Sequence, residues 1–296
     1  MNRDSIRIAM GMAAVLAALS AGCGTETGTL QVAISGEEAA ETGYPADDGA
    51  IAFVDGWETD VHAVVVSIGT FELHGADGEQ ASIDVDPVIV DLHQGEQTLF
   101  ELPAIGARRW EDVRYTTTPA TAASVDVGTV DAAIRQRMID NGWSMYISAT
   151  FTKGAETRTI EWGFDNDILN EDCIGGDGTE GVVVAAGAIT EAQITYHLDH
   201  LFFDTLRLDD AVMRFDAMAA VAGADGAITF DELDTQRLAD LRDAEGEPLT
   251  DEMGEPLVYD PGSFALPEPT LLYMMLAAST TMGHWNGEGH CEYVVR

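Results

Sequence analysis

The chain has 296 residues, of which 52 are Asp or Glu and 14 are Lys or Arg, giving a formal net charge of -38 at pH 7. A negative field of this size repels nucleic acid, so a nucleic-acid partner is excluded. Hydrophobic residues make up 46% of the chain, which separates it from disordered acidic proteins and predicts a folded core. Because carboxylates occur from end to end, they indicate a solvated acidic surface, with cation binding as the alternative.

The first 23 residues have the layout of an export signal. Arg3 and Arg7 precede an apolar run, residues 8–19, that is too short to cross a bilayer about 30 Å thick, and small residues then lead to Cys23. This layout resembles the signal peptide of bacterial lipoproteins. The resemblance implies that residues 1–22 are removed and that Cys23 carries lipid, which anchors the protein outside the cytoplasm. Gly24 favours the outer membrane or the cell surface over the inner membrane. An ordinary signal peptide with an unmodified cysteine is the alternative.

The remaining cysteines predict a disulfide. If Cys23 is lipidated, Cys173 and Cys291 are alone in an oxidising compartment, where two thiols pair. Such a bridge would tie the C-terminal tail to the middle of the chain.

After a polar tether, residues 23–28, the patterning is mainly that of β-strands up to residue 204. Apolar residues alternate or run continuously in segments 29–35, 51–54, 61–74, a strand ending at 92, 98–102, 110–118, 143–152, 157–162, 181–186 and 188–203. A helix is predicted at 128–141, ended by Gly142, and an acidic loop at 165–180. The region 29–204 is either one unit or two halves, 29–120 and 121–204. No internal repeat is apparent.

Part of this region resembles a known family. The segments GTLQVAIS, DVHAVVVSIGTFELH and VDLHQGEQTLFELPAIGARRWEDVRY, all within residues 28–119, are similar to a family of secreted bacterial lipoprotein domains of unknown function. The resemblance implies a prealbumin-like β-sandwich and supplies no chemistry.

From residue 205 to residue 296 the pattern becomes helical. Helices are predicted at 210–220, 230–241 and 271–282, with a Glu, Pro and Gly-rich loop before the last. The fold class expected for the whole chain is therefore mainly β, with a small helical C-terminal part.

Residues 221–232, VAGADGAITFDE, lie between the first two of these helices and resemble an EF-hand calcium loop with Gly226 at its sixth position. Val221 and Gly223 stand where that family has Asp or Asn, so we expect binding only at millimolar calcium. A calcium-free helix-turn-helix is the alternative. The resemblance implies a small ligand set, namely Asp225, the Ala227 carbonyl and Glu232.

Histidines supply a second candidate metal site. If 188–203 is a strand, its alternation places His197 and Asp199 on the polar face and His200 on the opposite face. His197 and Asp199 are therefore candidate ligands, and His200 is predicted to be a core-edge histidine. A pair spaced like His197 and His200 would share one face only on a helix.

The glycine-rich segment 283–291 carries His284 and His290 beside Cys291. One interpretation is a zinc-type site that gathers His197, Asp199, His284 and His290, which requires ring nitrogens within about 8 Å of each other. The alternative is a knot held by the disulfide, in which His284 caps the preceding helix.

The sequence has no nucleophile elbow, phosphate-binding loop or dinucleotide motif, and no catalytic or cofactor-binding residue is predicted. We therefore expect a lipid-anchored extracytoplasmic protein that acts as a non-enzymatic binding or structural module for an unidentified protein or small molecule. Its metal would be Ca²⁺, or alternatively Zn²⁺ or another divalent ion. The rival hypothesis is a metal-dependent enzyme or a metal-acquisition protein.

Overall fold

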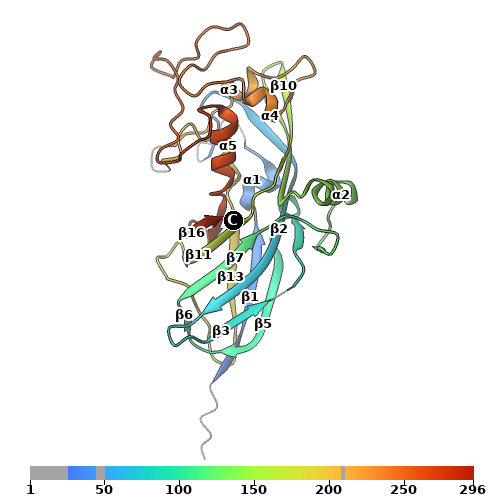
Figure 1. Ribbon diagram of the computed structural model, residues 1–296, viewed down its shortest axis with the longest axis vertical. Coiled ribbons are helices and arrows are strands. Elements are labelled where there is room, and N and C mark those ends of the chain that lie inside the picture. Colours follow the sequence, from blue (N-terminus) through green and yellow to red (C-terminus); the bar gives the residue numbers. More distant parts are fainter. Residues whose placement is uncertain (1–25, 45–50, 84, 208–210) are drawn as a thin grey trace, which may run out of the picture.

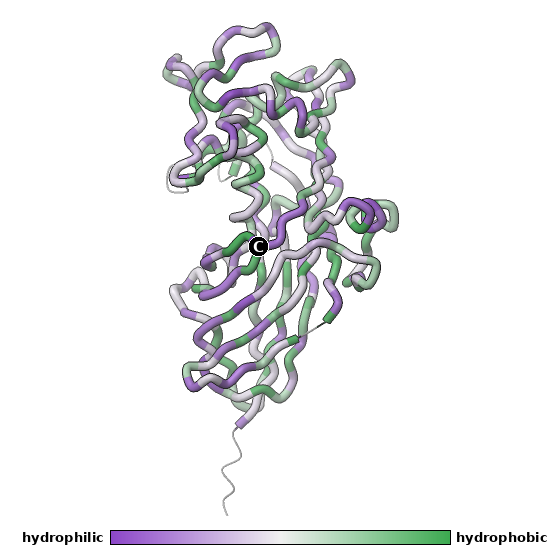
Figure 2. Tube along the Cα trace, viewed as in Figure 1, coloured by the Kyte–Doolittle hydropathy of each residue, from purple (hydrophilic) through white to green (hydrophobic). Residues whose placement is uncertain are grey.

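The computed structural model describes residues 26–44, 51–83, 85–207 and 211–296 and is mainly β (Figure 1). The predicted signal peptide and Cys23 lie outside the described residues. In the part that is described, no helix is both long enough and apolar enough to cross a membrane. Apolar and polar residues are interleaved along the strands (Figure 2), as the sequence pattern predicts.

A four-stranded sheet joins the two ends of the chain. Its order is β15 (Gly283–Trp285), β13 (Ile189–Tyr196), β1 (Thr27–Ser35) and β5 (Gln97–Gly106), with β1 and β13 parallel. Thr195 is paired with Ser35 on one side and with His284 on the other. The C-terminal ends of β1 and β13 therefore meet the start of β15 at one edge.

A ten-stranded sheet is built around β2 (Glu58–His74), which has 17 residues and is buried on both faces over residues 63–69. β2 contains the whole segment 61–74 that the sequence predicts to be a strand. The path of the sheet is β14 (Ala227–Ile228), β10 (Glu156–Phe164), β9 (Met145–Lys153), β2, β7 (Asp112–Thr117), β11 (Ile168–Ile174) and β16 (His290–Val295), with β3 (Gln80–Ile83), β4 (Val88–Asp91) and β8 (Val125–Val127) off this path.

Two strands that the sequence pattern placed differently form a small separate sheet. β6 (Arg109–Trp110) pairs with β12 (Val182–Val183), so the predicted strand 181–186 is reduced to two residues that pair with the segment before β7. The predicted strand at 51–54 is reduced to a single bridge between Phe53 and Met213.

One hydrophobic core extends through both sheets. Part of this core is an aromatic group of Phe53, Phe151, Phe202 and Phe215, in which Phe151 stacks on Phe215 with ring centroids 3.8 Å apart. A second, smaller cluster lies where α2 (Ala132–Asn141) packs Met138 against β2 and β9. Asp131 caps the start of α2 by accepting two backbone N–H bonds, and Gly142 ends it at φ +65°, as predicted.

Apart from α2, the helical elements of the described residues are short. They are α1 (Glu37–Thr42), the 3-10 helices η1 (Leu92–Gln94) and η2 (Leu198–Phe202), α3 (Asp216–Ala219), α4 (Phe230–Leu233) and α5 (Leu271–Ser279). Only α5 matches the length expected for the C-terminal region. Single turns replace the predicted helices 210–220, whose first residue is not described, and 230–241. The last residues form β15 and β16, so 205–296 is not a separate helical part.

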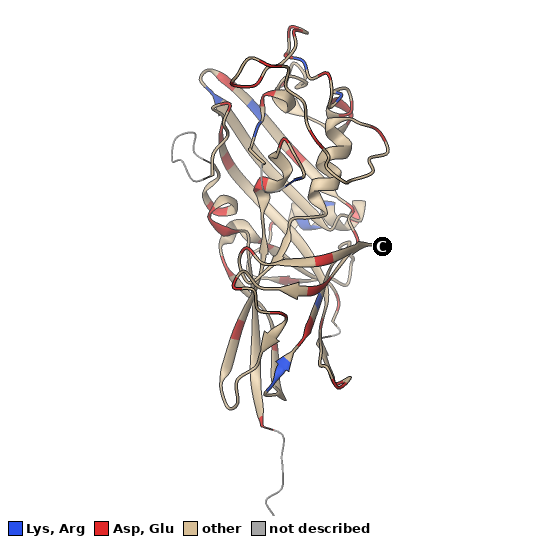
Figure 3. Ribbon diagram, turned by 90° about the vertical axis from the view of Figure 1, so that its left-hand side faces the viewer, with Lys and Arg blue, Asp and Glu red and all other residues tan. Residues whose placement is uncertain are grey.

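Two successive octapeptides, 243–250 (DAEGEPLT) and 251–258 (DEMGEPLV), form the same turn, so the chain has a short internal repeat after all. In each, the leading aspartate accepts N–H bonds from the third and fifth residues. Leu249 N–H donates to Leu241 and Leu257 N–H donates to Leu249, which stacks the turns. Asp and Glu residues are scattered along the chain, both here and in the rest of the ribbon (Figure 3).

The predicted disulfide is confirmed. Cys173 on β11 and Cys291 on β16 are bonded, with Cα atoms 4.0 Å apart, and they close a loop of 118 positions. Residues 168–174 are a strand rather than the predicted loop, because β16 and β7 pair with them on either side.

Replacing both cysteines by serine should lower the free energy of unfolding by about 4 kcal/mol, since the bridge restricts a long loop in the unfolded chain. Urea denaturation measures this. Unmodified protein treated with reductant is the matched control and should lose the same amount. Equal midpoints for the oxidised protein and the variant would contradict the prediction.

Candidate metal centre

Three buried histidines from two distant segments meet where β13 ends. His197 is the first residue after β13, His200 lies in η2, and His284 lies in β15. The chain leaves the strand at Tyr196 and turns into η2, so His197 and His200 lie on the same side, as on a helix. The prediction that His200 points away from His197 is therefore wrong.

The three histidine rings lie close together, but the group of ligand atoms that lie within 4.8 Å of one another includes His197 and His200 and does not include His284. Their centroids are 4.1 Å apart for His197 and His284, 5.1 Å for His200 and His284, and 5.6 Å for His197 and His200. His197, Asp199 and His200 each offer a ligand atom, and these three atoms lie within 4.8 Å of one another. Two ligand atoms bound to the same zinc ion at about 2.0–2.1 Å lie roughly 3–3.5 Å apart, so a small closure of the side chains would suffice.

Thr281 fixes the tautomer of His200. The Thr281 hydroxyl donates to the Ala278 carbonyl at 2.8 Å, so its oxygen accepts from His200 Nδ1–H at 2.9 Å. Nε2 of His200 therefore carries the free lone pair. Metal-binding histidines are oriented in this way by a partner on their other nitrogen.

Two other ring nitrogens are buried with no hydrogen-bond partner among the described residues, Nε2 of His197 and Nδ1 of His284. The histidines are 6% and 8% exposed. An unsatisfied buried polar atom costs about 1–3 kcal/mol, so such atoms are rare in folded proteins. A bound cation would satisfy a nitrogen lone pair at this position.

Burial, and to a smaller extent the neighbouring imidazoles, keep His200 and His284 neutral. Together they lower the pKa of His200 to about 3 and that of His284 to about 4. Burial also raises the pKa of Asp199, against the attraction of His197. Neutral imidazole is the form that binds metal ions.

Two carboxylates flank His197 on its solvent side. Glu37 Oε1 lies 3.8 Å from Nε2 and Glu288 Oε2 lies 3.9 Å from Nδ1. Both distances are too long for a hydrogen bond. One ligand atom from each of these three residues lies within 4.8 Å of the others. The Glu37 side chain is 35% exposed and that of Glu288 is 80% exposed.

The structure thus brings together His197, Asp199 and His284 from the predicted set, but not His290. His290 is exposed on β16, opposite Ile174 in the ladder, and belongs to neither cluster. Sequence reasoning missed Glu37 and Glu288. Glu37 is 160 positions from His197 and reaches it only through the parallel pairing of β1 and β13.

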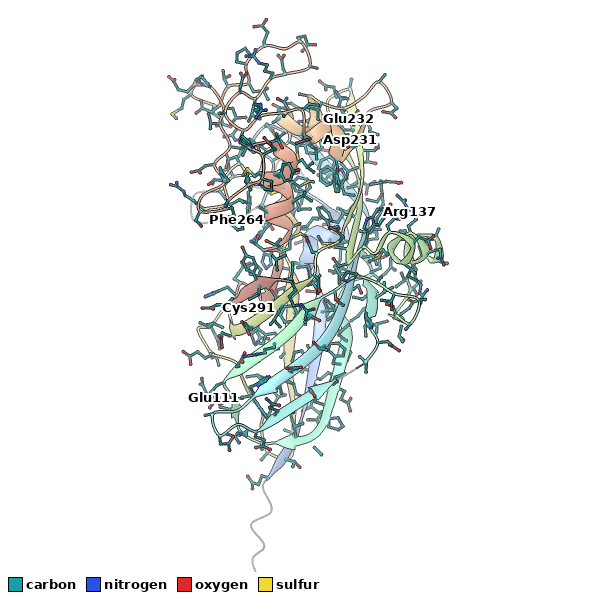
Figure 4. All side chains as sticks on the ribbon, in the orientation of Figure 1. Glu111, Arg137, Asp231, Glu232, Phe264 and Cys291 are labelled. Carbon is teal, nitrogen blue, oxygen red and sulfur yellow. A yellow bond between two sulfur atoms is a disulfide. The ribbon has the colours of Figure 1, made fainter. Side chains whose placement is uncertain are left out.

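The EF-like loop, residues 221–232, is separate from the histidine cluster. Glu232 and Asp231 are at the upper end of the molecule, whereas Cys291, close to the histidine-bearing β15, is near the middle (Figure 4). Asp225 accepts from Ala227 N–H, the Ala227 carbonyl accepts from Gly223 N–H, and Glu232 accepts from the N–H and hydroxyl of Thr229. These predicted ligand groups therefore stabilise the loop's own turn and the capping box of α4.

Comparisons of the chain with protein families, with curated proteins and with solved structures gave no match.

Without metal, the protein should lose stability as the pH falls below about 6.5. Both His200 and His284 have folded-state pKa values below the unfolded value of 6.5, so their side chains take up protons in the unfolded chain before they do so in the folded protein. The free energy of unfolding should therefore fall by about 1 kcal/mol per histidine between pH 7 and 5.5. Urea midpoints measured with a chelator present test this. His200→Gln should reduce the pH dependence, and the exposed-histidine variant His62→Gln should not. A midpoint that is flat from pH 7 to 5.5 would refute the prediction.

Glu232→Ala should lower the free energy of unfolding by about 1 kcal/mol, because the capping box of α4 is lost. Glu232→Gln should cost less, since an amide oxygen can still accept the Thr229 N–H. Both effects should be the same with and without calcium in thermal unfolding. A loss seen only in calcium would instead indicate a calcium loop.

Proposed function

We propose that this protein binds a divalent transition-metal ion of the Zn²⁺ type and acts as a non-enzymatic metal-binding module outside the cytoplasm. The observation that carries the proposal is the meeting of three buried histidines, two of which have unpartnered ring nitrogens. The proposed ligands are His197, Asp199, His200 and His284.

The donor set favours transition metals over calcium or magnesium. Imidazole nitrogens suit zinc, copper, nickel and iron, whereas calcium and magnesium prefer oxygen ligands. His200 has its free nitrogen fixed by Thr281, so that part of the site is organised before an ion binds.

Binding has more support than catalysis. The ligand atoms of His197, Asp199 and His200 already lie within 4.8 Å of one another, and His284, whose ring packs beside them, would have to move closer to supply the fourth ligand of a tetrahedral ion. With that position filled the site would be closed, as structural zinc sites are, whereas catalytic sites keep one position open. A cavity of about 820 Å³ lies on β9 and β10, but its lining contains none of the clustered residues. A metal-dependent enzyme is therefore the weaker alternative.

The setting is proposed on separate grounds. The disulfide supports an oxidising compartment, and the lipoprotein-like signal supports an anchor on Cys23 and a place at the outer membrane or the cell surface. In this setting the module could acquire metal for an unidentified partner protein. A prealbumin-like sandwich stays part of this proposal, whereas calcium at Asp225 and Glu232 has less support because both carboxylates already accept hydrogen bonds.

Metal titration tests the proposal. The purified, oxidised protein should bind one Zn²⁺ per chain in calorimetry, with a rise in melting temperature, because an ion that binds only the folded state stabilises it. His200→Gln and His284→Gln should each weaken binding by at least about 100-fold, and Thr281→Val by about tenfold. His62→Gln is the matched control and should bind like the unmodified protein.

Circular dichroism would check that each variant is folded. Two results would overturn the proposal: no binding of Zn²⁺, Co²⁺, Ni²⁺ or Cu²⁺ at micromolar concentration, or full binding by a folded His200→Gln variant.

A further inference from the structure

The carboxylates of Glu37 and Glu288 stand between solvent and the buried histidines. We propose that, together with His197, they form a second, outer cation position, from which a divalent ion passes to the buried ligands. This inference rests on the proposed function, because it describes how the same site is loaded.

The outer position has its own geometry. Glu37 Oε1 and Glu288 Oε2 approach different nitrogens of His197, at 3.8 and 3.9 Å, and one ligand atom from each of the three residues lies within 4.8 Å of the others. The cluster is more than a pair of acidic residues, because Nε2 of the nearly buried His197 faces Glu37 without a hydrogen-bond partner.

His197 belongs to both clusters, and this makes the two positions alternatives. A neutral imidazole has one lone pair, since its other nitrogen carries a proton. His197 can therefore serve an ion in the outer position or an ion in the inner position, but not both. One ion passed between the positions fits this limit.

The exposed fraction of the side chain falls from Glu288 through Glu37 to His197, as the transfer of an ion from solvent to the interior requires. The Glu288 side chain is 80% exposed, that of Glu37 is 35% exposed, and His197 is 6% exposed. A hydrated ion would thus meet hard, solvated carboxylates first and would exchange its water for nitrogen ligands on the way in.

Glu288 is held at this position by the backbone around it. Asn286 exchanges two hydrogen bonds with Gln193, each of 2.8 Å, and Thr195 donates to the Gly287 carbonyl at 2.8 Å. The disulfide at Cys291 follows three residues later. Glu37 is the first residue of α1 and is separated from the end of β1 by Gly36 alone.

Stopped-flow loading measures the effect of the outer position. Zn²⁺ is mixed with the oxidised protein, and free Zn²⁺ is followed with a fluorescent indicator. The double variant Glu37→Gln/Glu288→Gln should load about tenfold more slowly, because local carboxylates raise the concentration of cations at the mouth of a site. Its equilibrium Kd should change less than twofold. Glu38→Gln/Glu41→Gln removes the same charge from exposed positions of α1 and should load like the unmodified protein.

Each outcome has one meaning. Slow loading of the first double variant with an unchanged Kd supports the outer position. Equal loading rates for the two double variants overturn it. A Kd weakened as much as the loading rate also overturns it, since Glu37 and Glu288 would then be ligands of the final site. If the unmodified protein binds Zn²⁺ and the outer position fails, the proposed function still stands; if it binds none, both fail.

Discussion

The pairing of Thr195 with two partners is the constraint on which the site depends. Thr195 lies between Ser35 of β1 and His284 of β15, is fully buried, and donates its hydroxyl to Gly287. Three segments that are far apart in the sequence are thereby brought to one edge of the small sheet. Directly beyond this edge lie Glu37 and His197, and the disulfide holds the third segment in place.

The same arrangement has a cost for folding. A small apolar residue would be easier to bury than an imidazole that lacks a partner, because each unsatisfied polar atom costs about 1–3 kcal/mol. Two such atoms in one cluster would use a noticeable part of the 5–15 kcal/mol by which proteins are commonly stable. A cation bound as proposed would remove this cost.

Much of the fold follows from local patterns, and the site does not. A strong local signal made several elements predictable, namely β1, β2, α2, α5 and the disulfide. The signal is the spacing of apolar residues in the strands and helices, the glycine that ends α2, and the two cysteines that remain after Cys23. The end of β13 was not predictable, because the alternation of apolar residues continues through Leu198 although the strand ends at Tyr196. The predicted strand, 188–203, therefore continued seven residues too far, which placed His200 on the wrong face. Glu37 and β16 could not be assigned because only long-range pairing places them. The lengths of the helices predicted at 210–220 and 230–241 were too great. Apolar residues spaced every 3.6 positions favour a helix, but this does not offset the free-energy cost of starting one where the chain turns after a few residues.

Under the proposed function, the acidic surface and the buried histidine cluster would have different selectivities for cations. Scattered carboxylates concentrate cations of every kind, and salt screens this attraction over about 10 Å. They cannot distinguish zinc from the calcium and magnesium that are more abundant in solution. Nitrogen ligands in a buried pocket bind first-row transition metals in preference to hard cations. His197 is the residue shared by the two clusters among the described residues, so in the proposed scheme discrimination would fall on the step at which the ion passes from the carboxylates to the buried histidines.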